Sequence, residues 1–337
     1  MRGYHPKKLL LLIGIVSFLV IMHGLFSLTV IQHSASLNRL PGINSFEELQ
    51  QSKAFSFSIF SDNQGYSPAS NLYMARMNMH IRKTNDLFVL GVGDHVSRAS
   101  ANEFLFYVCN DPFWKNNFYP TIADGENSLF GKSQEDWGSG RGMFESIDLN
   151  RKNNVVFSNE KVDYYSLIEH ESGYTVHFIS LYFPDEPSNI DAAFRPSSKL
   201  FLQNTLSQIQ KSKFDIIVIA AHSRFGFFTE YLSPELKQMV LQKADIVVSG
   251  STHYYERQIS KNMDIGPLIL NSGSVTNPRF GSKPGFIQVS VLPDQQGIHV
   301  QFIPLDQQTF QLNSKPYAFF KTFNGRVYEL EYFMQAL

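Results

Sequence analysis

Residues 87–95 of the 337-residue chain read LFVLGVGDH, and this stretch decides the fold. Apart from one glycine, its first six residues are large and apolar, as expected of a short strand that is buried on both faces. Gly93, Asp94 and His95 then follow where the strand stops. The carboxyl ends of parallel strands lie along one edge of a sheet, where ligands commonly bind. The stretch therefore predicts an α/β sheet with a carboxylate and an imidazole at that edge.

Four other stretches repeat this layout of an apolar strand followed by a short polar segment. Their polar segments are Ser61-Asp62-Asn63-Gln64-Gly65, Asp124-Gly125-Glu126-Asn127, His222-Ser223 and Ser249-Gly250-Ser251-Thr252-His253. Each segment alone is a weak signal, because a strand followed by Gly-Asp is common and a lone His after a strand is usually structural. Oxygen and imidazole ligands that converge on one edge suit divalent transition metals such as Mn, Fe or Zn. The order and spacing of all five segments together predict a metal site.

In that order and spacing, the five segments resemble the calcineurin-like metallophosphoesterase superfamily across about residues 55–305. The stretch 247–257 and the turn Asn271-Ser272-Gly273-Ser274 resemble the purple-acid-phosphatase branch in particular. The resemblance implies a four-layer α/β/β/α sandwich of two mixed sheets. The residues alone favour the same class of fold, since strands and helices alternate first and a run of strands follows.

The resemblance also implies that two divalent transition metals, Mn, Fe or Zn, are held by one shared ligand and several separate ligands. The shared ligand is Asp94. The other ligands of the first ion are Asp62, Gln64 and His253. The other ligands of the second ion are Asp124, His222 and Ser251.

Several of these positions depart from the family's pattern. Gln64 and Ser251 stand where the family has His, and a carbonyl oxygen or a hydroxyl is a poorer ligand for Zn or Fe than imidazole. Gly125 stands where the family has the His that helps to protonate the leaving group. Asp124 replaces an Asn and adds a negative charge that partly compensates. We therefore expect the second ion to bind more weakly than the first.

The implied reaction is hydrolysis of a phosphomonoester or a phosphodiester, in which a metal-bound hydroxide attacks the phosphorus. His95, beside Asp94, either acts as the catalytic acid or forms a hydrogen bond behind the ligands. Arg224, in the loop after His222, either contacts the phosphate or is a solvated surface residue; Ser251 is a further candidate for substrate contact. The departures from the pattern leave a second hypothesis, a membrane-anchored binding or scaffold module that kept the fold without the activity.

The N-terminal residues 1–32 predict a signal anchor, that is, one transmembrane helix. Basic residues, among them Lys7 and Lys8, precede an apolar run over residues 9–31, which is long enough to cross a bilayer core of about 30 Å as a helix. The basic flank predicts a cytoplasmic N-terminus and a single-pass protein whose catalytic domain lies outside the cytoplasm. The alternative is a signal peptide that is removed, which would leave a secreted protein.

The rest of the chain is divided by composition into a linker over residues 33–52, a metallophosphoesterase-like domain over residues 53–306 and a C-terminal extension over residues 307–337 that packs on the domain. The net charge of −1 gives no indication of a nucleic-acid-binding surface. Because Cys109 is the single cysteine, an internal disulfide and a cysteine-based metal site are both excluded.

Overall fold

The computed structural model divides into two compact units, Met1–Arg39 and Leu40–Leu337. All the residues that it describes belong to the second unit, and they are 46–64, 68–96, 112–123, 141–182, 194–223, 231–257, 266–276, 278, 283–294, 296–305, 318–323 and 327–330. Across these ranges, no helix is both long enough and apolar enough to cross a bilayer. The anchor expected at residues 1–32 lies outside the described residues.

A first mixed sheet contains both parallel and antiparallel strands. Its strands are β1 (Phe55–Phe60), β2 (Val89–Val92), β3 (Phe118–Thr121), β11 (Gly285–Leu292), β12 (Gly297–Pro304), β13 (Ala318–Thr322) and β14 (Val327–Leu330). They lie in the order β14-β13-β12-β11-β1-β2-β3. The strands β1, β2 and β3 are parallel to one another, and the remaining pairs are antiparallel.

A second mixed sheet faces the first. Its strands are β4 (Val155–Phe157), β5 (Tyr164–Glu169), β6 (Thr175–Leu181), β7 (Asp215–Ala221), β8 (Ile246–Ser249), β9 (Tyr255–Arg257) and β10 (Leu268–Ser272). They lie in the order β4-β5-β6-β7-β8-β10-β9, and the central strands β6, β7, β8 and β10 are parallel.

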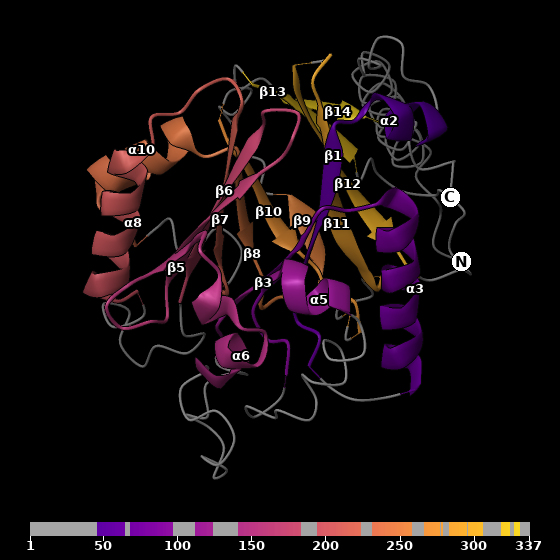
Figure 1. Cartoon of the computed structure of the whole chain (residues 1–337), viewed down its shortest axis with the longest axis horizontal. Coiled ribbons are helices and arrows are strands. Elements are labelled where there is room, and N and C mark those ends of the chain that lie inside the picture. The colour runs from indigo at the N-terminus through magenta and orange to yellow at the C-terminus, as the bar shows by residue number, and fades with distance from the viewer. Residues whose placement is uncertain are drawn as a thin grey trace, which may run out of the picture. The chain divides into compact units, whose positions relative to one another are not determined.

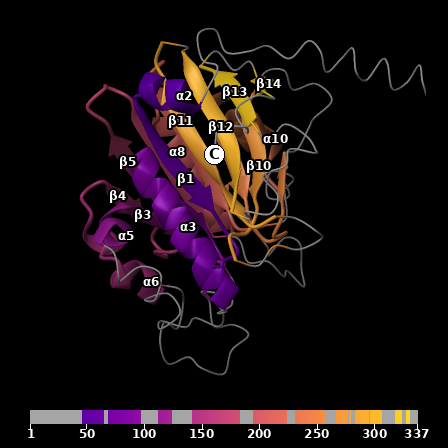
Figure 2. The ribbon, with the colours of Figure 1, turned by 90° about the vertical axis from the view of Figure 1, so that its right-hand side faces the viewer.

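Helices cover the outer faces of both sheets. Figure 1 shows α3 (Pro68–Thr84) on the outer side of the first sheet and α8 (Pro196–Gln208) and α10 (Pro234–Lys243) on the outer side of the second. The turned view in Figure 2 shows α3 running along β1. The expectation of two mixed sheets in an α/β sandwich is confirmed.

The apolar side chains form two buried clusters that explain why the central strands are apolar throughout. Val218 of β7 packs between the sheets in one cluster with residues of the first sheet, such as Phe57. Its neighbour Ile219 points the other way and packs with Leu202 of α8 and Val240 of α10. Since successive side chains of a strand point to opposite faces, both faces of β7 are buried, as expected of a parallel strand that is covered on both sides.

The residues at its first turn explain where helix α10 begins. The Ser233 side chain accepts a hydrogen bond from the Leu236 N–H at 3.3 Å, and Pro234 occupies the first turn, where its missing N–H costs nothing. Helix α8 likewise begins at a proline, Pro196, which is favoured at the first helical position.

Two of the expected boundaries change. The linker predicted over residues 33–52 contains a helix, α2 (Phe46–Ser52). The C-terminal extension predicted over residues 307–337 contributes β13 and β14, which pair antiparallel with β12 and with each other. These strands therefore continue the first sheet. Between β3 and β4, the described residues include α6 (Arg141–Ser146) and the short 3₁₀-helix η2 (Leu149–Arg151).

Candidate metal centre

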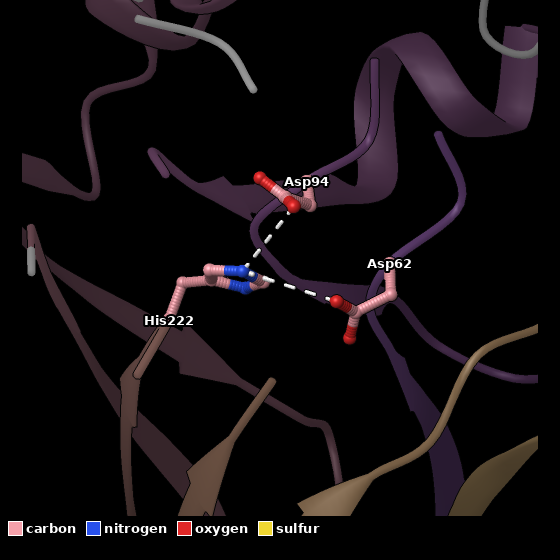
Figure 3. A group of neighbouring side chains, drawn as sticks. All are labelled: Asp62, Asp94 and His222. Atoms are coloured by element: carbon pink, nitrogen blue, oxygen red, sulfur yellow. Dashed lines mark ion pairs between the residues drawn. The ribbon is translucent and has the colours of Figure 1, made fainter. Parts of the chain in front are cut away.

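Three of the expected ligands meet at the carboxyl ends of strands from both sheets. Asp62 and Asp94 follow β1 and β2 of the first sheet, and His222 follows β7 of the second. The His222 Nε2 atom lies 3.5 Å from Asp94 Oδ2 and 3.9 Å from Asp62 Oδ1 (Figure 3). One ligand atom from each residue lies within 4.8 Å of the other two, which is close enough for all three to bind one cation.

A fourth expected ligand, His253, joins this cluster from the segment between β8 and β9. Its Nε2 atom lies 3.4 Å from Asp62 Oδ1. All four residues are between 0 and 5% exposed. The structure therefore brings Asp62, Asp94, His222 and His253 together in a buried position, although they span almost two hundred residues of sequence.

The orientation of the His222 ring suits a metal ligand. Its Nδ1 atom lies 2.6 Å from the carbonyl oxygen of Val92. A carbonyl oxygen can only accept a hydrogen bond, so Nδ1 carries the proton and Nε2 presents its lone pair to the two carboxylates. Histidine ligands in metal sites are commonly held through their other nitrogen in this way.

Two glycines make room for this ring. A Cβ atom on Gly93 would lie 2.7 Å from His222 Cβ, and Gly93 has a φ of +75°, which favours glycine. A Cβ atom on Gly250 would lie 2.5 Å from His222 Nδ1. Because real Cβ contacts are longer than this, the glycines before Asp94 and before Ser251 are required by the close approach of the imidazole.

The backbone of the cluster is unusual at four residues that are not glycine. Asp62, Asp94, Ser251 and His253 have φ values of 55°, 53°, 74° and 60°. The left-handed region costs such residues on the order of 1 kcal/mol or more each, and residues held there gather at functional sites. Here the turns with left-handed residues direct the carboxylates and imidazoles toward the same position.

The charges of the cluster fit a divalent cation. Two buried carboxylates within a few ångströms of each other lose their hydration and repel each other. A divalent ion between them would offset both the lost hydration and the repulsion. Mixed carboxylate and imidazole ligands suit Mn, Fe or Zn. The residues present therefore fit the ion that the sequence analysis expects at this edge.

The structure locates only some of the other expected ligands and substrate contacts. The Gln64 N–H donates to the Asp94 carbonyl oxygen at 3.0 Å, and the Ser251 N–H donates to both carboxylate oxygens of Asp62 at 3.1 Å. Both residues are therefore beside the cluster, with their backbones in contact with it. Asp124, Gly125 and Arg224 lie outside the described residues, and their roles stay predictions.

His95 lies behind the ligands. Its Nε2 atom accepts the Gly93 N–H at 3.2 Å, and its ring makes edge contacts with Phe60 and Phe118 at centroid distances of 5.2 and 5.4 Å. Burial, and then the nearby His222, lower the pKa of His95 to about 3. Both roles expected of His95, as the catalytic acid and as a hydrogen-bonding residue behind the ligands, stay predictions.

The polar residues that hold the ligands in place are not indicated by the sequence patterns. The Asn271 side chain donates to the Gly250 carbonyl oxygen at 3.0 Å and so fixes the loop that carries Ser251 and His253. The hydroxyl groups of Ser61 and Ser272 lie behind Asp62. The turn over residues 271–274 was noticed in the sequence as similar to a family turn, but nothing in its spacing indicates which atoms it contacts.

No protein-family model and no curated protein matches the sequence. Among solved structures, a dimetal phosphatase from Danio rerio is 12% identical with a TM-score of 0.54, over 75% of this chain and 97% of that one. A purple acid phosphatase from yellow lupin (Lupinus luteus) seeds is 13% identical with a TM-score of 0.48, over 75% of this chain and 52% of that one, so this chain spans about half of its length. At these identities the similarity concerns the fold alone, and the chain shares the fold of the dimetal phosphatase.

Proposed function

We propose that the chain is a metal-dependent hydrolase of a phosphomonoester or a phosphodiester. The observation that carries the proposal is the buried cluster of Asp62, Asp94 and His222, whose ligand atoms lie within 4.8 Å of one another at the ends of strands from two sheets. The fold, shared with a dimetal phosphatase from Danio rerio, supports the same reaction class.

The chain's own residues would hold and orient the ion. Asp62 Oδ1, Asp94 Oδ2 and His222 Nε2 are the ligand atoms, and His253 Nε2 lies beside the first of them. A bound divalent ion supplies a Lewis acid that polarises a phosphoryl oxygen and lowers the pKa of water. In the neutral ring, the Val92 carbonyl oxygen keeps the His222 proton on Nδ1, so that Nε2 faces the ion.

The number and identity of the ions are part of the proposal. We infer Mn, Fe or Zn from the mixed oxygen and nitrogen ligands. A second ion would share Asp94 and would need Asp124 as a ligand. Ser251 directs its backbone N–H at Asp62, and its hydroxyl is a poorer ligand for Zn or Fe than the imidazole expected at this position. This second ion is therefore expected to bind more weakly than the first.

The test is hydrolysis of small aryl phosphate monoesters and diesters by the full-length chain after loading with Mn²⁺, Fe²⁺ or Zn²⁺. Loss of a residue that only holds a ligand in place typically weakens metal affinity or activity by roughly 10–100-fold. Asp94→Asn removes a ligand atom, so we expect it to weaken both metal binding and hydrolysis by more than that. The matched control is Asp148→Asn, because Asp148 is half-exposed and pairs with Lys115 and Arg151 at the surface. Wild-type chain that binds metal but hydrolyses none of the esters would contradict the proposal.

A second candidate is a binding or scaffold protein that kept the fold without the activity. The observation that favours it is Ser251, which stands where an imidazole ligand is expected and contacts Asp62 through its backbone. This candidate predicts that wild type and Asp94→Asn are equally inactive toward every ester of the panel, whatever their metal content.

The location of the protein stays a proposal as well. We infer from residues 1–32 a single-pass anchor with a cytoplasmic N-terminus and the hydrolase domain outside the cytoplasm. Fractionation of cells that express the full chain should find it in the membrane. Recovery of a shortened chain from the medium would favour the cleaved signal peptide instead.

A further inference from the structure

The two carboxylate oxygens of Asp62 have different surroundings. Oδ1 faces the cation position, since it lies 3.4 Å from His253 Nε2 and 3.9 Å from His222 Nε2. Oδ2 accepts a short hydrogen bond from the Ser61 hydroxyl. The Ser251 N–H is shared between both oxygens at 3.1 Å. One oxygen is therefore directed at the site and the other is tied to the protein.

Ser61 is in turn held by Ser272. The Ser272 Oγ donates to the Ser61 Oγ at 2.6 Å. Each hydroxyl has a single proton, so a chain that runs from Ser272 to Ser61 and on to Asp62 uses each proton once and gives the carboxylate the last one. Carbonyl oxygens offer alternative acceptors, that of Gly273 at 2.9 Å to Ser61 and that of Ser249 at 3.2 Å to Ser272. The charged Asp62 carboxylate forms a stronger hydrogen bond than a neutral carbonyl oxygen does, which favours the series of hydrogen bonds from Ser272 through Ser61 to Asp62.

This pair of hydroxyls connects the two sheets. Ser61 follows β1 of the first sheet, and Ser272 is the last residue of β10 in the second. Both side chains are fully buried, so water does not compete for the hydroxyls. Ser274 adds a further link, because its hydroxyl donates to the Asp62 carbonyl oxygen at 2.7 Å and its backbone bridges to Ser61.

We propose that Ser61 and Ser272 are positioning residues that hold Oδ2 of Asp62, so that Asp62 binds the cation through Oδ1 alone. The inference rests on the metal site of the proposed function. Ser272 contacts no ligand and acts through Ser61. With both hydroxyls in place, the carboxylate is already oriented before the ion arrives, and no rotation of the Asp62 side chain opposes binding.

The first test is Mn²⁺ affinity, measured by calorimetry on the full-length chain. Loss of an outer-shell partner typically weakens metal affinity by roughly 10–100-fold, and we expect Ser61→Ala to fall in that range. Ser272→Ala should weaken binding less, since Ser61 can still reach Asp62. The matched control is Ser290→Ala on β11, because Ser290 is equally buried but contacts none of the ligands in the described structure. Its affinity should equal that of the wild type.

A second readout separates positioning from general stability. Without the Ser61 hydroxyl, Oδ2 loses its hydroxyl donor and is held less firmly, so Asp62 would bind through both oxygens and raise the coordination number. Visible absorption of bound Co²⁺ reports this, because intensity falls as the coordination number rises. Ser61→Ala should therefore show a weaker Co²⁺ band, and Ser61→Thr, which keeps a hydroxyl, should restore the wild-type band.

Several results would overturn the inference. They are wild-type chain that binds no Mn²⁺, equal Mn²⁺ affinity in Ser61→Ala, Ser272→Ala and Ser290→Ala, and an unchanged Co²⁺ band in Ser61→Ala. Hydrolysis is read separately. Wild type that binds Mn²⁺ without hydrolysing any ester would contradict the proposed function, while the weaker affinity of Ser61→Ala would still support the positioning role.

Discussion

Asp86 and Asp94 lie at opposite ends of the same strand, β2, and both carboxylates are buried. The oxygens of Asp86 accept hydrogen bonds from neutral side chains, which are Ser56, Ser58, Thr84 and Gln288. Asp94 instead faces the imidazole of His222 at 3.5 Å, with the carboxylate of Asp62 in the same cluster. At one end of the strand lies the carboxylate of Asp86, which is surrounded by hydrogen-bond donors and needs no ion. At the other end, the carboxylates of Asp94 and Asp62 share one buried site.

The difference shows what makes a buried carboxylate a candidate ligand. Several hydrogen bonds from hydroxyl and amide groups stabilise the charged form of a single carboxylate. Two carboxylates in one buried space repel each other, and neutral donors around them leave that repulsion in place. A cation between them removes it. The comparison therefore predicts opposite effects of substitution at the two ends of β2.

The largest expected effect is the contrast in stability between Asp86→Asn and Asp94→Asn without metal. Asp86→Asn replaces an acceptor with an amide donor among hydroxyl donors, and we expect it to lower the free energy of unfolding by about 3 kcal/mol. Asp94→Asn removes one of two facing charges and should not lower it. Urea unfolding in the presence of a chelator measures both changes.

Mn²⁺ should then remove most of this contrast in stability. A ligand that binds only the folded state stabilises it by about 2.7 kcal/mol at a hundredfold excess over its dissociation constant. We expect this gain in wild type and in Asp86→Asn, and none in Asp94→Asn. If Asp94→Asn unfolds as easily as Asp86→Asn and gains equally from Mn²⁺, the two ends of β2 do not differ as described.

A slightly smaller effect concerns a third buried carboxylate, Asp163. It accepts the Tyr182 N–H at 2.8 Å and the Ser198 hydroxyl at 2.9 Å, yet burial raises its pKa from 3.8 to about 6. A raised pKa means that the folded protein binds the proton more tightly than the unfolded chain. The resulting stabilisation is fully present below about pH 4 and is lost as the pH rises through about 6.

We therefore expect the free energy of unfolding to fall by roughly 2–3 kcal/mol from this group between pH 4 and pH 7.5. The measurement is urea unfolding across that range for wild type and for Asp163→Asn, which keeps the shape of the side chain without the charge. The difference between the two curves should shrink to a constant offset above pH 7.5. A difference that does not change with pH would show that Asp163 titrates alike in the folded and unfolded states.

The smallest expected effect concerns a carboxylate at the surface. Asp148 lies 3.2 Å from Lys115 Nζ and 3.8 Å from Arg151, and all three side chains are largely solvated. Exposed ion pairs contribute about 0–1 kcal/mol, so Asp148→Asn should change stability by less than that. It should leave Mn²⁺ affinity unchanged. A loss of several kcal/mol in the free energy of unfolding would mean that burial does not determine how much each of these carboxylates contributes to stability.

The sequence predicted the two mixed sheets and the convergence of Asp62, Asp94, His222 and His253. Those predictions succeeded because apolar strands and the polar residues after them recur in order along the chain. The three-residue strands β4 and β9 were missed, since a run of three residues shows too little alternation to be recognised.

The contacts around the ligands could not be predicted in the same way. Ser61 and Ser272 are more than two hundred residues apart, and their contact depends on how the ends of β1 and β10 meet. The backbone donor at Ser251 follows from a left-handed turn that a serine does not indicate. Contacts of this kind depend on tertiary geometry, which local sequence patterns do not contain.

The central claim is that the cluster of Asp62, Asp94 and His222 binds a divalent cation. Elemental analysis of the full-length chain tests it, after incubation with Mn²⁺, Fe²⁺ or Zn²⁺ and removal of free metal, beside Asp94→Asn treated in the same way. The account predicts about one or two ions in each wild-type chain and none in Asp94→Asn. Equal metal content in the two proteins, or none in either, would contradict it.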